Sequence, residues 1–406
     1  MNRRKSIVAL SSRVAEVLLL FALATAAAHA QNFQVLHSFS GGGDGDLPSA
    51  GLTMDRGGNL YGTTQFGGAG LNGTVFKLSR AGSGWVLVTL YGFRGGSDGG
   101  NPEGRVVFGP DGGLYGTTTY GGVGSGTVFE IRPPATVCHA VSCPWTETPL
   151  YTFQGGSDGA FPQYVDLTFD RSGNVYGTTL GGGRFSCPSG SCGVVFQLTP
   201  AGGSWTENVL YRFNAGDDGY GPYSGVILDG AGNLYGTAAF GGGASLGTAY
   251  ELSPSASGWT PTVLTDFSGG GGFPLGGLTF DAHGNLFGTG YIGGTAFELQ
   301  PSGGNWIFTQ IASFNGYDGP TGSLTFDSSG NAYGANLTGG ANGDGFVFKL
   351  TPSGGGWTVT DLYDFRNEED GGLPMGNVIL DSSGNLYGTT VQGGQHGVGV
   401  VWEITP

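Results

Sequence analysis

One short phrase recurs along the whole chain and limits its fold more than any other feature. It reads DRGGNLYGTT from Asp55, DRSGNVYGTT from Asp170, DGAGNLYGTA from Asp229 and DSSGNLYGTT from Asp381. Aligned on the aromatic residue of LYGT, it occurs seven times, at Tyr61, Tyr115, Tyr176, Tyr235, Phe287, Tyr333 and Tyr387, with spacings of 46 to 61 residues. A period of this length, with several short apolar runs in each unit, is typical of a β-propeller or a β-solenoid.

Each unit reads as four strands, which we call A to D. In the first unit the sequence predicts strand A at Gly51–Asp55, B at Leu60–Thr64, C at Thr74–Leu78 and D at Trp85–Phe93. Glycine-rich turns join A to B and C to D, and the aspartate of the phrase is expected to accept hydrogen bonds from turn amides. The strands carry apolar residues at both parities, which favours sheets packed on both faces, as propeller blades are.

The two ends of the repeat array distinguish a closed ring from an open stack. The chain after residue 30 begins with a D-type strand, FQVLHSF from Phe33, and ends with a C-type strand, VVWEITP from Val400. Tryptophan recurs eight residues before the final phenylalanine of six D strands, at Trp85, Trp145, Trp205, Trp259, Trp306 and Trp357. One D strand is spare at the start and one is lacking at the end. The N-terminal strand is therefore expected to complete the last blade of an all-β, seven-bladed propeller of four-stranded antiparallel blades.

The first thirty residues have the pattern of a secretory signal peptide. Arg3, Arg4 and Lys5 precede a short apolar run at residues 17–23, and Ala28-His29-Ala30 matches a cleavage site. We expect residues 1–30 to be removed and residues 31–406 to form one exported domain. Its 11 basic and 29 acidic residues would give a net charge of −18, which disfavours nucleic acid as a partner. No later apolar run is long enough to span a membrane, and a monomer is expected.

The pattern GNLYGTT…GG…GTVFKL…GGW…LYxF resembles the GloVer (Gloeo/Verruco) tandem repeat of exported bacterial proteins, and the resemblance covers residues 33–406. It implies a secreted or surface role and brings no established catalytic residues. Members often carry a C-terminal sorting signal. This chain ends at Pro406 without an apolar tail or basic cluster, so free secretion is expected rather than anchoring.

The four cysteines lie in two insertions, CHAVSC at Cys138 and Cys143 and CPSGSC at Cys187 and Cys192. The insertions belong to connections on opposite faces of a propeller, which are separated by the length of a strand. A four-cysteine zinc site is thus disfavoured. Two local disulfides, Cys138–Cys143 and Cys187–Cys192, are predicted, as suits an oxidising compartment, with free thiols or metal binding as the alternatives.

A second repeated phrase, D-G-x-x-P, stands in the D–A connections. The D–A and B–C connections share one face, so a ring of loop aspartates is expected there: Asp44, Asp98, Asp158, Asp218, Asp318 and Asp370, with Asp46 beside the first. The simpler interpretation is that each aspartate caps amides of its own loop. The alternative is that some of them bind Ca²⁺, although no EF-hand spacing occurs.

Varied aromatic residues lie on the same face, at Phe66, Tyr120, Tyr220 and Tyr223. Aromatic rings beside carboxylates could bind neutral sugars, although rings that merely pack the loops are an alternative. Catalytic signals are sparse: His37, His139, His283 and His396 are scattered, which disfavours a Ser-His-Asp or His–metal site. The leading hypothesis is a secreted, non-catalytic binding or scaffold propeller for extracellular or cell-envelope glycans. The alternative is a polysaccharide lyase or glycoside hydrolase that uses loop aspartates.

Overall fold

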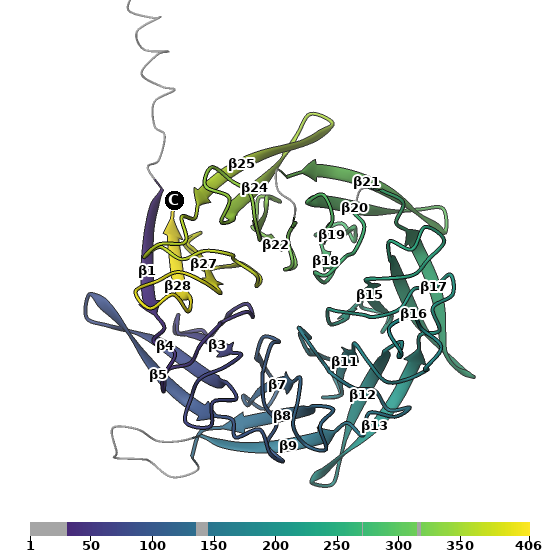
Figure 1. Ribbon diagram of the computed structural model, residues 1–406. Coiled ribbons are helices and arrows are strands. Elements are labelled where there is room, and N and C mark those ends of the chain that lie inside the picture. The colour runs from purple at the N-terminus through teal and green to yellow at the C-terminus, as the bar shows by residue number, and fades with distance from the viewer. Residues whose placement is uncertain (1–30, 135–144, 270, 315–317) are drawn as a thin grey trace, which may run out of the picture.

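The computed structural model describes residues 31–134, 145–269, 271–314 and 318–406 (Figure 1). Its strands form seven four-stranded antiparallel sheets, arranged as blades around a central opening. Blades 1 to 6 follow one another along the chain, from β2-β3-β4-β5 to β22-β23-β24-β25. Blade 7 is made of β26, β27, β28 and the N-terminal strand β1. The predicted fold class and the predicted ring closure are both confirmed.

The four kinds of strand have regular lengths. Strands A lie nearest the axis and are β2 (Thr53–Met54), β6 (Val107–Phe108), β10 (Thr168–Phe169), β14 (Ile227–Leu228), β18 (Thr279–Phe280), β22 (Thr325–Phe326) and β26 (Ile379–Leu380). Strands B are β3 (Leu60–Thr64), β7 (Leu114–Thr118), β11 (Val175–Thr179), β15 (Leu234–Ala238), β19 (Leu286–Gly290), β23 (Ala332–Asn336) and β27 (Leu386–Thr390). Strands C are β4 (Thr74–Ala81), β8 (Thr127–Arg132), β12 (Val194–Ala201), β16 (Thr248–Ser255), β20 (Thr295–Ser302), β24 (Phe346–Ser353) and β28 (Val400–Thr405). Strands D are β5 (Gly84–Gly92), β9 (Thr146–Thr152), β13 (Ser204–Arg212), β17 (Gly258–Asp266), β21 (Asn305–Ser313), β25 (Gly356–Asp364) and β1 (Asn32–Ser38).

Strand A is shorter than the five residues that the sequence predicts for blade 1. The residues before it leave the sheet because they approach the neighbouring blades around the axis. At Gly51, for example, a Cβ atom would lie 2.9 Å from the backbone nitrogen of Asn377, which precedes strand A of blade 7.

The repeated phrase is structural, as expected. In blade 1 the Asp55 carboxylate accepts hydrogen bonds from the amides of Gly57 (2.8 Å) and Asn59 (2.9 Å), and from the Tyr61 hydroxyl (3.1 Å). The same arrangement recurs at Asp170, Asp229, Asp327 and Asp381. Burial alone would raise the pKa of Asp55, but the hydrogen bonds from Asn59 and its neighbours outweigh burial and lower it. Each aspartate therefore fixes one A–B turn.

The glycine of LYGT leaves room for an aromatic ring of strand C. At Gly116 in β7 a Cβ atom would lie 2.7 Å from Cζ of Phe129 in β8, and Phe129 is fully buried. We expect Gly116→Ala to lower the free energy of unfolding by about 1–3 kcal/mol, because the ring has no free space to move into. Gly230→Ala is the control: it has no atom within 4 Å of the new methyl group and should change stability by less than about 0.5 kcal/mol. Urea unfolding of both variants checks this, and equal losses would contradict it.

The core lies between blades. Seven clusters of buried side chains occur among the described residues, and each joins two neighbouring blades. The cluster that closes the ring contains Leu36 and Phe39 from the N-terminal segment, Tyr387 and Val401 of blade 7, and residues of blade 1 such as Phe76. Trp85 of blade 1 also packs edge-on against Tyr387, with ring centroids 6.3 Å apart. Closure thus rests on side-chain packing as well as on the β1–β28 ladder.

The disulfide Cys187–Cys192 is present, with a Cα–Cα distance of 5.3 Å, so this prediction is confirmed. The predicted bridge Cys138–Cys143 and the predicted signal peptide lie outside the described residues. Within the described residues, no helix is long and apolar enough to cross a membrane.

Candidate ligand-binding site

The D–A and B–C loops share one face, as predicted, and they are joined by backbone bridges. Asp46 pairs with Phe66, Gly100 with Tyr120 and Tyr220 with Phe240, and blades 3 and 7 have equivalent bridges. Ile292 of blade 5 pairs instead with Asp318 in the next D–A loop. The Asp46 N–H donates to the Phe66 carbonyl over 2.9 Å, and the Asp46 carbonyl accepts from the Phe66 N–H over 3.0 Å. The loops therefore form a continuous, tied collar around the opening.

The loop aspartates are bound within their own loops. Asp98 accepts hydrogen bonds from the Arg94 amide (3.0 Å), the Gly96 amide (3.2 Å) and the Tyr91 hydroxyl (3.0 Å). Asp158 and Asp370 repeat this pattern, Asp44 accepts from Ser40 and His37, and Asp218 accepts from the Tyr211 hydroxyl over 2.5 Å. Asp318 lies beside the Tyr291 hydroxyl, and burial together with this carboxylate raises the pKa of Tyr291 to about 12. The carboxylates of Asp44, Asp98, Asp158 and Asp370 thus cap amides of their own loops, whereas those of Asp218 and Asp318 contact tyrosine hydroxyls.

The predicted aspartates do not converge. Apart from Asp44 and Asp46, which share one loop, each lies in a different D–A connection, and no group of three or more His, Cys, Asp or Glu residues placed to hold a metal ion occurs in the described part of the chain. Asp46 is partly buried, which raises the pKa of its carboxyl. The calcium hypothesis gains no support from this arrangement.

The predicted aromatic residues fall into separate groups. Phe66 and Tyr120 are exposed, at 38% and 51%, and Tyr120 packs against Phe161 with ring centroids 5.7 Å apart. Tyr220 and Tyr223 both pack against Phe240, at 5.4 and 6.1 Å. Tyr223 also stacks on Tyr164, at 6.2 Å. Among the residues predicted for the site, Tyr223 is the one that the structure places in the wall of the axial cavities described next.

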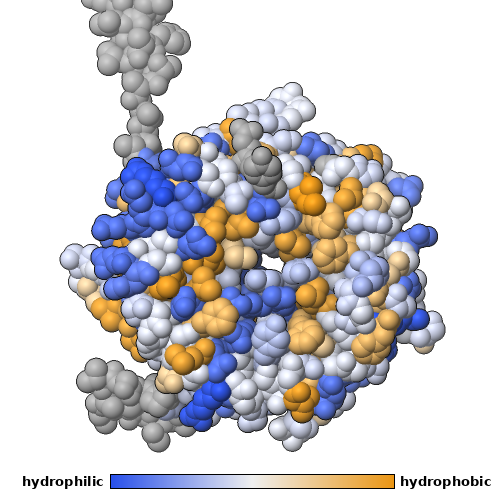
Figure 2. Space-filling view, viewed as in Figure 1, coloured by the Kyte–Doolittle hydropathy of each residue, from blue (hydrophilic) through white to orange (hydrophobic). Residues whose placement is uncertain are grey.

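The axis of the ring contains two adjoining cavities. The first, which we call the mouth chamber, has a volume of about 210 Å³ and is lined by Ser49, Gln163, Tyr164, Tyr223, Leu275, Tyr291, Thr321, Leu337 and Met375. The second, the inner chamber, has a volume of about 290 Å³ and reaches down to strands A. The two share the walls formed by Ser49, Tyr164, Leu275, Thr321 and Met375. Figure 2 shows a hollow at the centre of the ring, with hydrophobic side chains gathered around it and hydrophilic ones at one side.

The walls come from equivalent positions of the repeat. The residue after each loop proline is Ser49, Glu103, Gln163, Tyr223, Leu275, Thr321 or Met375. The residue two places before the first residue of strand A is Gly51, Arg105, Asp166, Gly225, Gly277, Ser323 or Asn377. The chain runs from the loop proline toward strand A, so the first set lies nearer the loop face and the second lies deeper.

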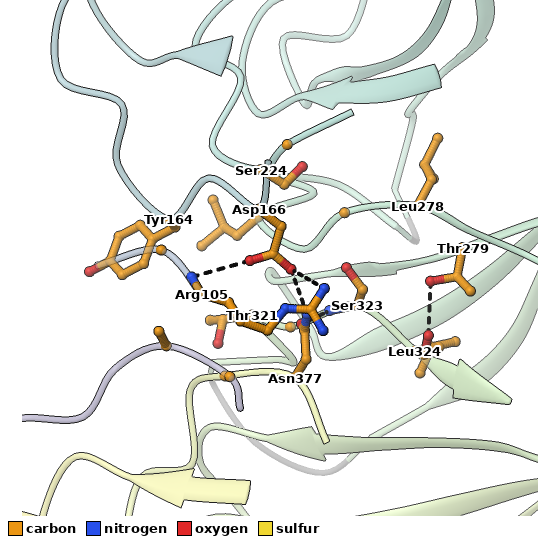
Figure 3. Close-up of a pocket in the computed structure, with 18 of the residues that line it drawn as sticks. Arg105, Tyr164, Asp166, Ser224, Leu278, Thr279, Thr321, Ser323, Leu324 and Asn377 are labelled. Carbon is orange, nitrogen blue, oxygen red and sulfur yellow. Dashed lines mark hydrogen bonds and ion pairs between the residues drawn. The ribbon is translucent and has the colours of Figure 1, made fainter. Parts of the chain in front are cut away.

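Three deep residues form a polar bridge across the axis, which we call the crossbar: Arg105, Asp166 and Asn377 (Figure 3). Nη2 of Arg105 lies 3.0 Å from Oδ2 of Asp166. The Asn377 side-chain amide donates to the same Oδ2 over 3.0 Å, and its carbonyl oxygen accepts from the Ser323 amide over 2.6 Å. Asp166 belongs to blade 3 and Asn377 to blade 7, so the crossbar links blades on opposite sides of the opening.

A buried acid and two buried polar atoms without partners lie around the chambers. Glu103 is 3% exposed and accepts hydrogen bonds from Thr119 (2.6 Å) and Gln65. Burial raises the pKa of Glu103, and these hydrogen bonds oppose the rise. Oγ of Ser49 and Nε of Arg105 are buried and have no hydrogen-bond partner in the structure. Such atoms are costly to leave unpaired, so they mark places where a ligand group could bind.

Sequence reasoning missed this site, although a signal was present. Within an otherwise regular repeat, the three residues after each loop proline vary in every unit, as in SAG after Pro48, EGR after Pro102 and YSG after Pro222. Blade 3 has one more residue than the others between Pro162 and strand A, and Tyr164 in this segment has a φ of 56°. Sequence variation within one short segment of a repeat marks residues that the scaffold does not require and that are free to bind partners.

Comparison with models of protein families shows which family the chain belongs to. The profile of the Gloeobacter/Verrucomicrobia repeat matches residues 19–142, 141–319 and 290–406. The chain belongs to this repeat family. The resemblance drawn from the sequence is confirmed, and the Gloeobacter/Verrucomicrobia repeat is here a propeller blade.

Solved structures resemble this member of the repeat family in fold alone. The extracellular domain of a protein from B. thetaiotaomicron, described as a hybrid two-component system, is 13% identical with a TM-score of 0.55, and the match covers 91% of this chain and 39% of that one. The chain thus spans about two fifths of the length of that relative. A protein described as a gluconolactonase is 13% identical with a TM-score of 0.46, covering 93% and 92%. The search of curated proteins found no match.

Proposed function

We propose that the protein is an exported, non-catalytic binding propeller that holds a neutral glycan of the extracellular space or cell envelope at the mouth chamber. The observation that carries this proposal is the lining of that chamber. It combines half-buried tyrosines, Tyr164 and Tyr223, with polar groups such as Gln163 and Ser49. Aromatic faces pack against the C–H faces of sugar rings, and neutral polar groups pair with hydroxyls.

Export is supported by the disulfide Cys187–Cys192 and by the signal-like pattern of residues 1–30. The comparison with the extracellular domain named above agrees in fold with such a location. We propose that the exported form is a monomer, because the ring closes on itself and pairs β1 within blade 7.

The alternative of a lyase or hydrolase acting through loop aspartates has less support. Two-carboxylate catalysis needs acids that face one substrate at a suitable separation. The loop aspartates instead accept hydrogen bonds from their own turns, as at Asp98 and Asp158, and stand in different blades. Asp→Asn at these positions is expected to affect loop stability rather than turnover.

Retention on immobilised polysaccharides tests the proposal. Residues 31–406 are assayed against cellulose, xylan and mannan, and at least one is expected to retain the protein without release of soluble sugar. Tyr164→Ala and Tyr223→Ala should each weaken retention about tenfold, a loss of about 1.4 kcal/mol. Tyr120→Ala, an exposed tyrosine outside the chambers, is the matched control and should bind as the parent does.

Three results would contradict the proposal. If no neutral polysaccharide retains the protein, glycan binding is contradicted. Steady release of sugar would contradict the non-catalytic assignment. Equal losses in all three tyrosine variants would contradict the mouth chamber as the binding site.

A further inference from the structure

We propose that the axial site is end-specific: it accepts the terminal residue of a neutral carbohydrate chain, which enters the mouth chamber and stops at the crossbar. This inference rests on the proposed function and adds the mode of binding to it. It is argued from the polar bridge across the axis, the size of the chambers and the polar residues that line them.

The crossbar lies in the path of a chain that would thread through the ring. The hydrogen bond between Asn377 and Asp166 joins blades 7 and 3, and Arg105 of blade 2 adds an ion pair to the same carboxylate oxygen. Because these residues lie deeper than the residues after the loop prolines, a ligand from the loop face meets the mouth chamber first. The crossbar thus narrows the axis beneath the residues after the loop prolines, which favours the binding of a chain end over threading of a chain.

The chambers are small. Their volumes of about 210 and 290 Å³ lie below the range of about 300–1,000 Å³ that is usual for pockets of drug-sized ligands. One sugar ring in the mouth chamber, with its hydroxyls directed at the crossbar, matches this scale. A longer internal stretch of chain would have to lie across the collar and would leave the chambers empty.

The polar atoms match hydroxyl groups. Ser49 is 5% exposed and its Oγ has no partner, and Nε of Arg105 is likewise buried and unpaired. A hydroxyl both donates and accepts, so one sugar can satisfy a serine, a guanidinium nitrogen and a carboxylate oxygen at once. Asp166 neutralises Arg105, and Glu103 stands in the wall, so an anionic sugar would meet no free positive charge. A neutral residue is favoured.

The repeat itself supplies a substitution that removes the Asn377 arm of the crossbar without a foreign side chain. Blades 1, 4 and 5 have glycine at the position of Asn377, namely Gly51, Gly225 and Gly277. Asn377→Gly is therefore expected to fold and to widen the inner chamber, which Asn377 lines beneath the mouth chamber. Asn342→Gly, in an exposed B–C loop of the neighbouring blade 6, is the matched control.

The test uses a length series of cello-, xylo- and manno-oligosaccharides, from the single sugar upward, with binding measured by calorimetry on residues 31–406. For the series that binds, affinity per chain is expected to level off after the first one or two residues. Blocking the bound end by methylation should abolish binding, whereas blocking the other end should not. Asn377→Gly should weaken binding at least about tenfold, and Asn342→Gly should leave it unchanged.

The outcomes separate the two proposals. If no oligosaccharide or polysaccharide binds, the proposed function fails and this inference fails with it. If binding occurs but rises steadily with chain length, tolerates both blocked ends or ignores Asn377→Gly, end-specific binding is overturned and glycan binding at the face stands.

Discussion

A chain that begins at Ser40 is expected not to form a stable propeller, whereas the chain that begins at Gln31 folds. The truncation removes β1, which pairs with β28 at six positions from Asn32↔Thr405 to Ser38↔Val400. It also removes Leu36 and Phe39 from the cluster between blades 7 and 1, where they are 8% and 0% exposed. Deleting buried side chains of this size costs about 2–5 kcal/mol each. The total, on the order of 5–10 kcal/mol, is comparable with the whole stability of an ordinary domain.

Thermal unfolding followed by circular dichroism, with size-exclusion chromatography, measures the effect. The truncated chain is expected to aggregate or to melt without cooperativity, because the free edge of β28 can pair with other molecules. Two point variants serve as comparisons. Phe39→Ala should lower the free energy of unfolding by about 3–5 kcal/mol, whereas Phe185→Ala, at a side chain that is 64% exposed, should lower it by less than about 0.5 kcal/mol.

Adding a peptide of residues 31–39 should restore a cooperative transition, because an added strand can complete an open sheet edge. A truncated chain that melts cooperatively within a few degrees of the parent would show that β1 is dispensable and that ring closure contributes little.

Most of the fold could be predicted because each blade repeats local rules. The glycine of LYGT, the aspartate of the A–B turn and the phenylalanine just after strand D each serve the same contact in nearly every unit, as Gly116, Asp55 and Phe93 illustrate. Counting such units gave the number of blades, and the order of strand types gave the closure. The short insertion around Cys187 likewise indicated a local bridge.

The candidate site could not be predicted in the same way, because its contacts join blades that are far apart in the sequence. Asn377 and Asp166 are 211 residues apart, and their hydrogen bond exists only because the ring brings blades 3 and 7 to one axis. The sequence pattern instead indicated the repeated loop aspartates as candidate ligands. Recurrence in every unit, however, marks what the scaffold needs, as the bonds of Asp98 to its own loop show. The varied residues after the loop prolines indicate the position of the candidate site better than the repeated aspartates do.

Two glutamates break the repeat in the outer strands and are expected to make stability depend on pH. Glu147 in β9 and Glu207 in β13 occupy a position that is apolar elsewhere, at Phe33, Leu87, Pro261, Phe308 and Val359. Oε1 of each is buried without a hydrogen-bond partner. Burial, together with the charge of Asp98, raises the pKa of Glu147 to about 8. Burial, together with Asp158, raises the pKa of Glu207 to about 7.

The sign follows from proton linkage. Both carboxyls titrate near 4.5 in the unfolded chain and higher in the folded one, so the folded state holds the protons more tightly. The protein is therefore expected to lose stability as pH rises from about 4.5 to 8, with no further loss from these groups above that. Glu147→Gln combined with Glu207→Gln removes the loss. After allowance for solvent screening of these partly buried groups, the double variant should be about 3–4 kcal/mol more stable than the parent at pH 9.

Urea unfolding of the parent and the double variant at pH 5 and pH 9 measures this difference directly, because the effects of all other acids are common to both chains. The gain should be small at pH 5, where the folded parent is largely protonated at both positions, and full at pH 9. Glu369→Gln, an exposed glutamate in a D–A loop, is the matched control and should change stability by less than about 0.5 kcal/mol at either pH. A gain equal at the two pH values would assign the effect to packing, and no gain at pH 9 would mean that water reaches both carboxylates between the blades.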